Sequence, residues 1–92
     1  MILLISYDLI GNERPSEYER FKQAIADNAG ESNYVKALYS QWFVDTTKTI
    51  SEWNSILKLA SDQNDSLMIV RLYAVPTGRY AASAVDWINT KF

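Results

Sequence analysis

The chain has 92 residues, carries nine Lys and Arg against eleven Asp and Glu, and contains neither cysteine nor histidine. These absences exclude disulfide bonds, thiolate nucleophiles, cysteine-based zinc sites and imidazole catalysis, so any chemistry depends on carboxylates, hydroxyls, Lys, Arg or a hard cation such as Mg²⁺ or Mn²⁺. The formal net charge of −2 gives no field that attracts polyanions, so a nucleic-acid partner is possible but is not favoured by charge.

The first residues predict a buried strand over 2–9, because Ile2–Ile5 is wholly apolar and rich in branched side chains. The run has no basic segment before it and is too short for a signal peptide or a membrane span. We therefore expect a cytoplasmic protein with no membrane contact, folded as a single domain over residues 1–92.

This first strand ends on a carboxylate, Asp8, which follows Tyr7 and precedes a polar loop. A carboxylate at the point where the chain leaves the core offers an oxygen ligand to a hard cation. Aspartates in this position also cap the following loop by accepting hydrogen bonds from backbone amides. Both interpretations of Asp8 remain open from the sequence.

Residues 16–29 predict a helix. Ser16 and Glu19 have the spacing of a reciprocal capping box, and Gly30 provides a left-handed stop. Apolar side chains recur at three- and four-residue spacing, which forms one stripe: Tyr18, Phe21, Ala24, Ile25 and Ala29.

Residues 34–47 are rich in aromatic and β-branched side chains and have no helical period, so we predict two strands, 34–39 and 42–47. The reversal is placed near Ser40 and Gln41. No Asn-Gly or Asp-Gly pair marks it, so one longer bent strand is the alternative.

A second capping box, Thr49 with Glu52, predicts a helix over 49–62. Its apolar stripe consists of Ile50, Trp53, Ile56, Leu57 and Ala60.

Residues 66–75 predict a strand that is apolar on both faces except at Arg71. Arg71 can form an ion pair with Asp8 or Asp45, or direct its guanidinium at a phosphate. The tail, 79–91, returns to helical spacing, and three aromatic side chains enlarge its apolar area for core or dimer packing: Tyr80, Trp87 and Phe92.

The predicted order is β-α-β-β-α-β followed by a third helix. Right-handed crossovers make this an α+β protein, a ferredoxin-like βαββαβ sandwich with an added C-terminal helix and with both main helices on one face of the sheet. The first and last strands then leave Ile2, Leu4, Met68 and Val70 on the other face. Either the third helix or a partner subunit must cover them.

Three segments together resemble the Cas2-like and VapD-like family of small proteins: Leu4–Leu9, Leu38–Phe43 and Asp65–Tyr73. The match spans about three quarters of the chain in order and spacing, through short and mostly apolar motifs. The resemblance implies a symmetric homodimer formed by pairing of the sheets, in which the Asp8 side chains of the two subunits face each other across a cleft that can hold Mg²⁺. It also implies catalytic positions at Asp8, Ser40 and Tyr7, with Asp8 as the metal ligand. Ser40 and Tyr7 are otherwise a turn residue and a half-buried aromatic.

Two departures from the family pattern shape the functional prediction. Members that handle nucleic acids usually carry several arginines after the first strand, whereas Arg14 and Arg20 stand among three glutamates here. The helical tail replaces the terminal strand of CRISPR Cas2 proteins, which favours a stand-alone homologue. We therefore expect a non-catalytic dimeric adapter that binds a protein partner. The alternative is a Mg²⁺-dependent endonuclease that acts on RNA or DNA, with Arg14 and Arg71 as nucleic-acid contacts.

Overall fold

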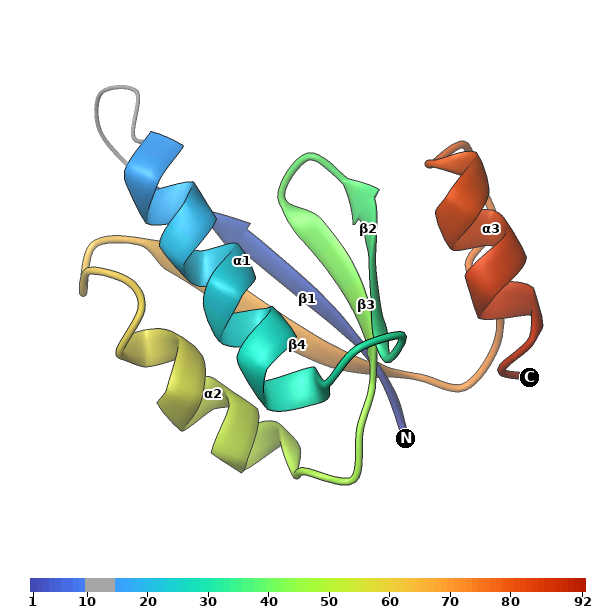
Figure 1. Cartoon of the computed structure of the whole chain (residues 1–92), viewed down its shortest axis with the longest axis horizontal. Coiled ribbons are helices and arrows are strands. Elements are labelled where there is room, and N and C mark those ends of the chain that lie inside the picture. Colours follow the sequence, from blue (N-terminus) through green and yellow to red (C-terminus); the bar gives the residue numbers. More distant parts are fainter. Residues whose placement is uncertain (10–14) are drawn as a thin grey trace.

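The computed structural model describes residues 1–9 and 15–92. Within these residues the elements alternate along the chain as follows (Figure 1): β1 (Ile2–Asp8), α1 (Pro15–Ala29), β2 (Tyr34–Leu38), β3 (Gln41–Asp45), α2 (Ile50–Lys58), β4 (Ser66–Leu72) and α3 (Ala82–Asn89). The predicted α+β class and order of elements are confirmed. No helix of the described residues combines the length and the apolar composition needed to cross a membrane.

The strands form one sheet in the order β2-β3-β1-β4, with every neighbouring pair antiparallel. β1 is therefore central, and β2 runs parallel to it on the far side of β3. Ile2 at the start of β1 lies opposite Asp45 and Leu72, and Asp8 at its end lies opposite Ser66. The turn at Tyr39 and Ser40 joins β2 to β3, so the predicted pair of strands is confirmed and the single bent strand is excluded.

Three elements are shorter in the structure than predicted. β4 ends at Leu72, because Leu72 already pairs with Ile2, the first residue of β1. α2 ends at Lys58 rather than at residue 62, since the amides of Ala60 and Ser61 donate to carbonyls only three residues back, at 3.1 and 3.4 Å. α3 begins only at Ala82, because the Ala81 amide donates to the carbonyl of Ala37 in β2 at 3.1 Å.

The two predicted capping boxes have different outcomes. In α2 the box is confirmed: the Thr49 hydroxyl accepts from the Glu52 amide at 3.1 Å, and the Glu52 carboxylate accepts from the Thr49 amide at 3.3 Å. In α1 the box is wrong, because the helix begins at Pro15 and Ser16 lies inside its first turn, where its hydroxyl donates to Glu17. Proline suits the first helical position, since its fixed φ is helical and it has no N–H to satisfy. The stop at Gly30 is confirmed by its φ of +90°.

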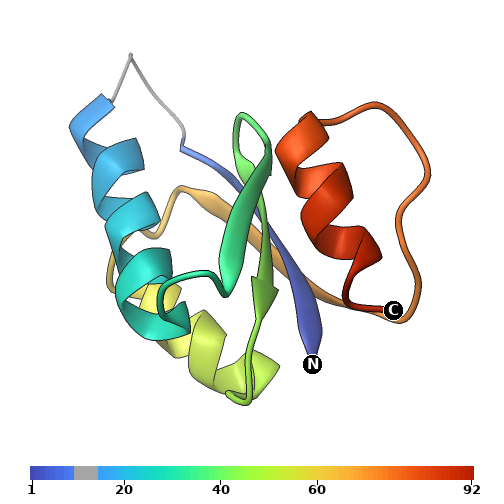
Figure 2. The ribbon, with the colours of Figure 1, turned by 45° about the vertical axis from the view of Figure 1, so that its right-hand side comes forward.

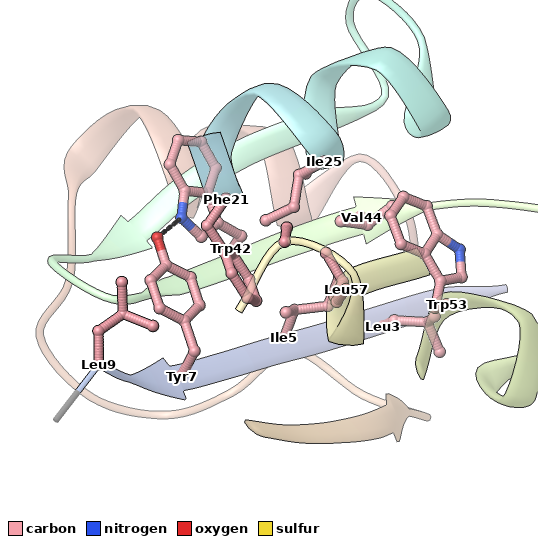
Figure 3. Packing of buried hydrophobic residues seen from close by; sticks show 11 residues of the cluster. Leu3, Ile5, Tyr7, Leu9, Phe21, Ile25, Trp42, Val44, Trp53 and Leu57 are labelled. Carbon is pink, nitrogen blue, oxygen red and sulfur yellow. Dashed lines mark hydrogen bonds between the residues drawn. The ribbon is translucent and has the colours of Figure 1, made fainter. Parts of the chain in front are cut away.

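α1 and α2 cover one face of the sheet, as predicted (Figure 1). Their stripes meet the odd-numbered side chains of β1 in the main core, where Phe21 and Ile25 of α1 and Trp53 and Leu57 of α2 are fully buried (Figure 3). Only the first member of the predicted α2 stripe is wrong. Ile50, the first residue of the helix, is 37% exposed and does not belong to the buried cluster.

α3 packs on the opposite face, over β2 and β3 (Figure 2). Its Ala84 and Ile88 are fully buried against Ile2, Ala37 and Phe43 in a second, smaller core. The same chain therefore covers this half of the outer face. The cover reaches Ile2 at the start of β1 but not the middle of β4, where Met68 remains 62% exposed and Val70 41% exposed.

Candidate functional site

The structure brings three of the predicted site residues, Tyr7, Asp8 and Ser40, together at one end of the sheet. Asp8 is exposed at the end of β1 beside Ser66 of β4, and the backbone amide of Tyr7 donates to the carbonyl of Ser40 at 3.1 Å. These residues line an open hollow of about 410 Å³ together with Ser6, Leu67 and Met68. The hollow therefore combines one carboxylate with several hydroxyl groups.

Tyr7 borders this hollow but its ring belongs to the main core. Successive side chains of a strand point to opposite faces, so the Tyr7 ring and the Asp8 carboxylate diverge. The ring centroid lies 3.8 Å from that of Phe21, and the hydroxyl accepts a hydrogen bond from Trp42 Nε1 at 3.0 Å (Figure 3). Burial raises the pKa of Tyr7 above its usual 10.0, against the opposing effect of the Trp42 hydrogen bond. At neutral pH the phenol is therefore protonated and holds the indole in place.

Of the two predicted nucleic-acid contacts, Arg71 can be placed relative to Asp8. Arg14 lies outside the described residues. Arg71 lies opposite Leu3, five residues from Asp8 along β1, which corresponds to about 17 Å of strand, and on the other face of the sheet. Its guanidinium lies 4.8 Å from the centroid of the Tyr73 ring.

The first alternative for Arg71, an ion pair with Asp8 or Asp45, does not form among the described residues. The Asp45 carboxylate pairs with Lys91 at 3.1 Å and with the N-terminal ammonium at 4.0 Å instead. Asp8 is out of reach because of the register just described. Arg71 consequently presents its charge to solvent at the exposed edge of β4.

The chemistry available at Asp8 depends on how many carboxylates converge there. Mg²⁺ is held by one or two carboxylates together with water or phosphate oxygens. In the described part of the chain, no group of three or more Asp or Glu side chains gathers into a metal site. One copy of the hollow supplies the single carboxylate of Asp8, so the implied paired site requires a second copy of the chain.

A second hollow lies on the other side of the Tyr39–Ser40 turn, and the sequence predictions missed it. It measures about 240 Å³ and reaches Tyr7 of the main core. The rest of its lining consists of aromatic and charged side chains from α1, β2, β3 and the β2–β3 turn: Tyr18, Glu19, Lys22, Lys36, Tyr39 and Trp42. We call these six residues the aromatic–lysine pocket. The i, i+4 spacing of Tyr18 and Lys22 on the first helix was the available signal, because it places both on one face.

No protein-family model matches the chain, and no curated protein matches it either. The resemblance to Cas2-like and VapD-like proteins thus stays a prediction that rests on three short motifs.

Proposed function

We propose that this chain is a non-catalytic homodimeric adapter, a Cas2-like interaction protein in which the uncovered half of the sheet binds a second copy. The observation that carries this proposal is the exposure of Met68 and Val70, two large apolar side chains on the outer face of β4. Around them lie the partly buried Leu4 and Leu72. We call these four residues the open strip.

The open strip is suited to self-association. Leu4 lies directly opposite Val70 in the β1–β4 pair, so the apolar side chains form a continuous surface. Covering such a surface contributes about 25 cal/mol for each Å² of apolar area removed from water. A two-fold axis through the strip places apolar on apolar and requires no complementary charge from a different partner.

The edges of the sheet support the same arrangement. At the β2 edge, the chain leading into α3 is hydrogen-bonded to Ala37 through the Ala81 amide. At the other edge, β4 has a sheet neighbour on one side only, and Met68, Val70 and Leu72 give its outer face an apolar stretch. An uncovered edge strand is a site for pairing with another chain. A second copy can therefore use both the face and the edge of β4.

The ferredoxin-like assignment is part of this proposal. It is supported by the sheet order β2-β3-β1-β4 and by the position of α1 and α2 on a single face. The family resemblance, which predicts dimers formed by pairing of sheets, agrees with the location of the open strip. Of the aromatic residues expected at the interface, Tyr80 and Trp87 pack within the second core, and Phe92 is exposed.

Light scattering coupled to size-exclusion chromatography tests the dimer. We expect the wild-type chain to elute at twice its 10.5 kDa mass at micromolar concentration, and Met68→Lys to elute as a monomer. Leu59→Lys is the matched control, because Leu59 is 87% exposed but lies after α2, away from the open strip. A wild-type mass of 10.5 kDa, or a Leu59→Lys effect equal to that of Met68→Lys, would refute the proposed interface.

The second candidate function is a Mg²⁺-dependent endonuclease of the VapD-like kind. The observation in its favour is that exposed Asp8 shares a hollow with Ser40 and with Met68 of the open strip. A dimer formed through the strip can therefore bring two Asp8 side chains toward one another. A bound Mg²⁺ would activate water and stabilise the charge that develops on a phosphodiester.

Asp8→Asn tests this candidate, since asparagine keeps the shape of the side chain and removes the charge that binds the metal. If the chain cleaves RNA or DNA, we expect cleavage to require Mg²⁺ or Mn²⁺ and to be lost in Asp8→Asn, with an unchanged far-ultraviolet circular dichroism spectrum. Cleavage that survives both EDTA and the substitution belongs to another site or to a contaminant.

A further inference from the structure

The aromatic–lysine pocket contains an exposed ring that the core does not require. The Tyr39 side chain is 71% exposed, although its ring lies 5.3 Å from that of Tyr18 and so forms one wall of the pocket. The floor is provided by Trp42, whose indole is buried and fixed by its hydrogen bond to Tyr7. A fixed floor with an exposed aromatic wall is an arrangement that accepts a planar group from solvent.

The charges around this pocket favour an anion. The Lys36 ammonium lies over two of the rings, 5.0 Å from the centroid of Tyr39 and 6.0 Å from that of Trp42, so a positive charge is in cation–π contact with the aromatic surfaces. Lys22 adds a second ammonium from α1, and Glu19 supplies the one carboxylate among the lining residues. Among the described residues, neither lysine is paired with a carboxylate.

The size and the net charge of the pocket limit the class of ligand that fits it. Its volume of about 240 Å³ lies below the approximately 300–1,000 Å³ of sites for drug-sized ligands, which limits the occupant to a single ring with one substituent. Two lysines and one glutamate leave a net charge of plus one, which matches one carboxylate better than a doubly charged phosphate.

We propose that the aromatic–lysine pocket binds a small aromatic monocarboxylate, with its ring against Tyr39 and its carboxylate between the Lys36 and Lys22 ammonium groups. Tyr39 is then the residue that selects a planar ring, and Lys36 is the residue that selects the negative charge. The pocket lies on the face covered by α1, whereas the open strip lies on the other face. Ligand binding therefore does not depend on the proposed dimer.

Titration of the ¹⁵N-labelled chain with benzoate tests this proposal, with the indole N–H signals of the three tryptophans as internal reporters. We expect a saturable shift of the Trp42 signal and no shift of the Trp53 and Trp87 signals, because these two indoles lie outside the pocket. Benzamide, which lacks the charge, and cyclohexanecarboxylate, which lacks the planar ring, should each bind about tenfold more weakly.

Variants on the pocket wall complete the test. Tyr39→Ala and Lys36→Gln should each weaken benzoate binding about tenfold, and both positions are exposed, so the fold is retained. Lys58→Gln is the matched control, an exposed lysine on α2 that should leave the affinity unchanged. Absence of a saturable Trp42 shift, wild-type affinity in both wall variants, or tighter binding of phenyl phosphate than of benzoate would each overturn the proposal.

Discussion

The two faces of the sheet differ in how completely they are covered, although the same four strands form both. On the face of α1 and α2, the β1 side chains Leu3 and Ile5 are fully buried. On the opposite face, α3 buries Ile2 but leaves Met68 and Val70 exposed. The inner face holds the larger cluster of buried side chains, so substitutions there should cost the most stability. The outer face is left with apolar surface that association can use.

The largest loss of stability is expected from a substitution in the core of the inner face. Trp53 of α2 is fully buried, and its Nε1 donates to the buried hydroxyl of Thr46 at 3.0 Å. Trp53→Ala creates a large cavity and removes the donor that bonds the Thr46 hydroxyl. We therefore expect a loss of about 3–5 kcal/mol in the free energy of unfolding. Urea denaturation followed by circular dichroism measures this loss.

Leu59→Ala provides the control for this substitution, because Leu59 is an exposed apolar residue close to the same helix. Substitutions at exposed positions usually change stability by less than about 0.5 kcal/mol. A similar loss in both variants would contradict the assignment of the main core to the face of α1 and α2.

The sequence predicts those features of the two faces that depend on residues close together in the chain, and it does not predict those that depend on distant residues. Residues three or four positions apart on a helix share a face, so the burial of Phe21 with Ile25 was predictable. The helical pattern of the tail was equally clear. Which surface that helix covers depends on contacts with Ala37 and Phe43, distant in sequence, so the choice between the same chain and a partner subunit stayed open.

Register and tertiary packing explain the two site features that the sequence analysis did not provide. Alternation along a strand indicates the face of a residue but not its cross-strand neighbour. The sequence therefore left the partner of Arg71 open, and the structure places it opposite Leu3. The aromatic–lysine pocket joins Lys22 of α1 with Lys36 and Tyr39 of the β2–β3 hairpin. No local pattern connects these segments.

The second prediction concerns the part of the outer face that α3 covers. Ile88 is fully buried against β2 and β3, so Ile88→Ala should lower the free energy of unfolding by about 2–5 kcal/mol. Since α3 packs on the smaller core, we expect the loss to appear first as local opening of this helix. Hydrogen exchange should accelerate at the amides of α3 more than at those of β1. Equal acceleration in both elements would mean that the two cores open as one unit.

The smallest stability effects are expected at two adjacent residues of β1, Tyr7 and Asp8, whose side chains point to opposite faces of the sheet. Tyr7→Phe removes the acceptor of the Trp42 N–H and leaves that buried donor unsatisfied, which should cost about 1–3 kcal/mol. Asp8→Asn, at an exposed position, should change stability by less than about 0.5 kcal/mol. Chemical denaturation of both variants measures the difference. A loss in Asp8→Asn as large as that in Tyr7→Phe would show that Asp8 has a structural role as a cap.

The pH dependence of stability sharpens this last comparison. Burial raises the pKa of Tyr7 above 10.0 in the folded chain, so folding favours the protonated phenol. The resulting contribution is fully present below pH 10.0 and is lost as the pH rises through the higher pKa of the folded state. Wild-type stability should therefore decline above pH 10.0 more steeply than that of Tyr7→Phe, which has no phenol to ionise at this position. Denaturation series at pH values on both sides of this limit measure the two slopes, and parallel slopes would contradict the buried, protonated state of Tyr7.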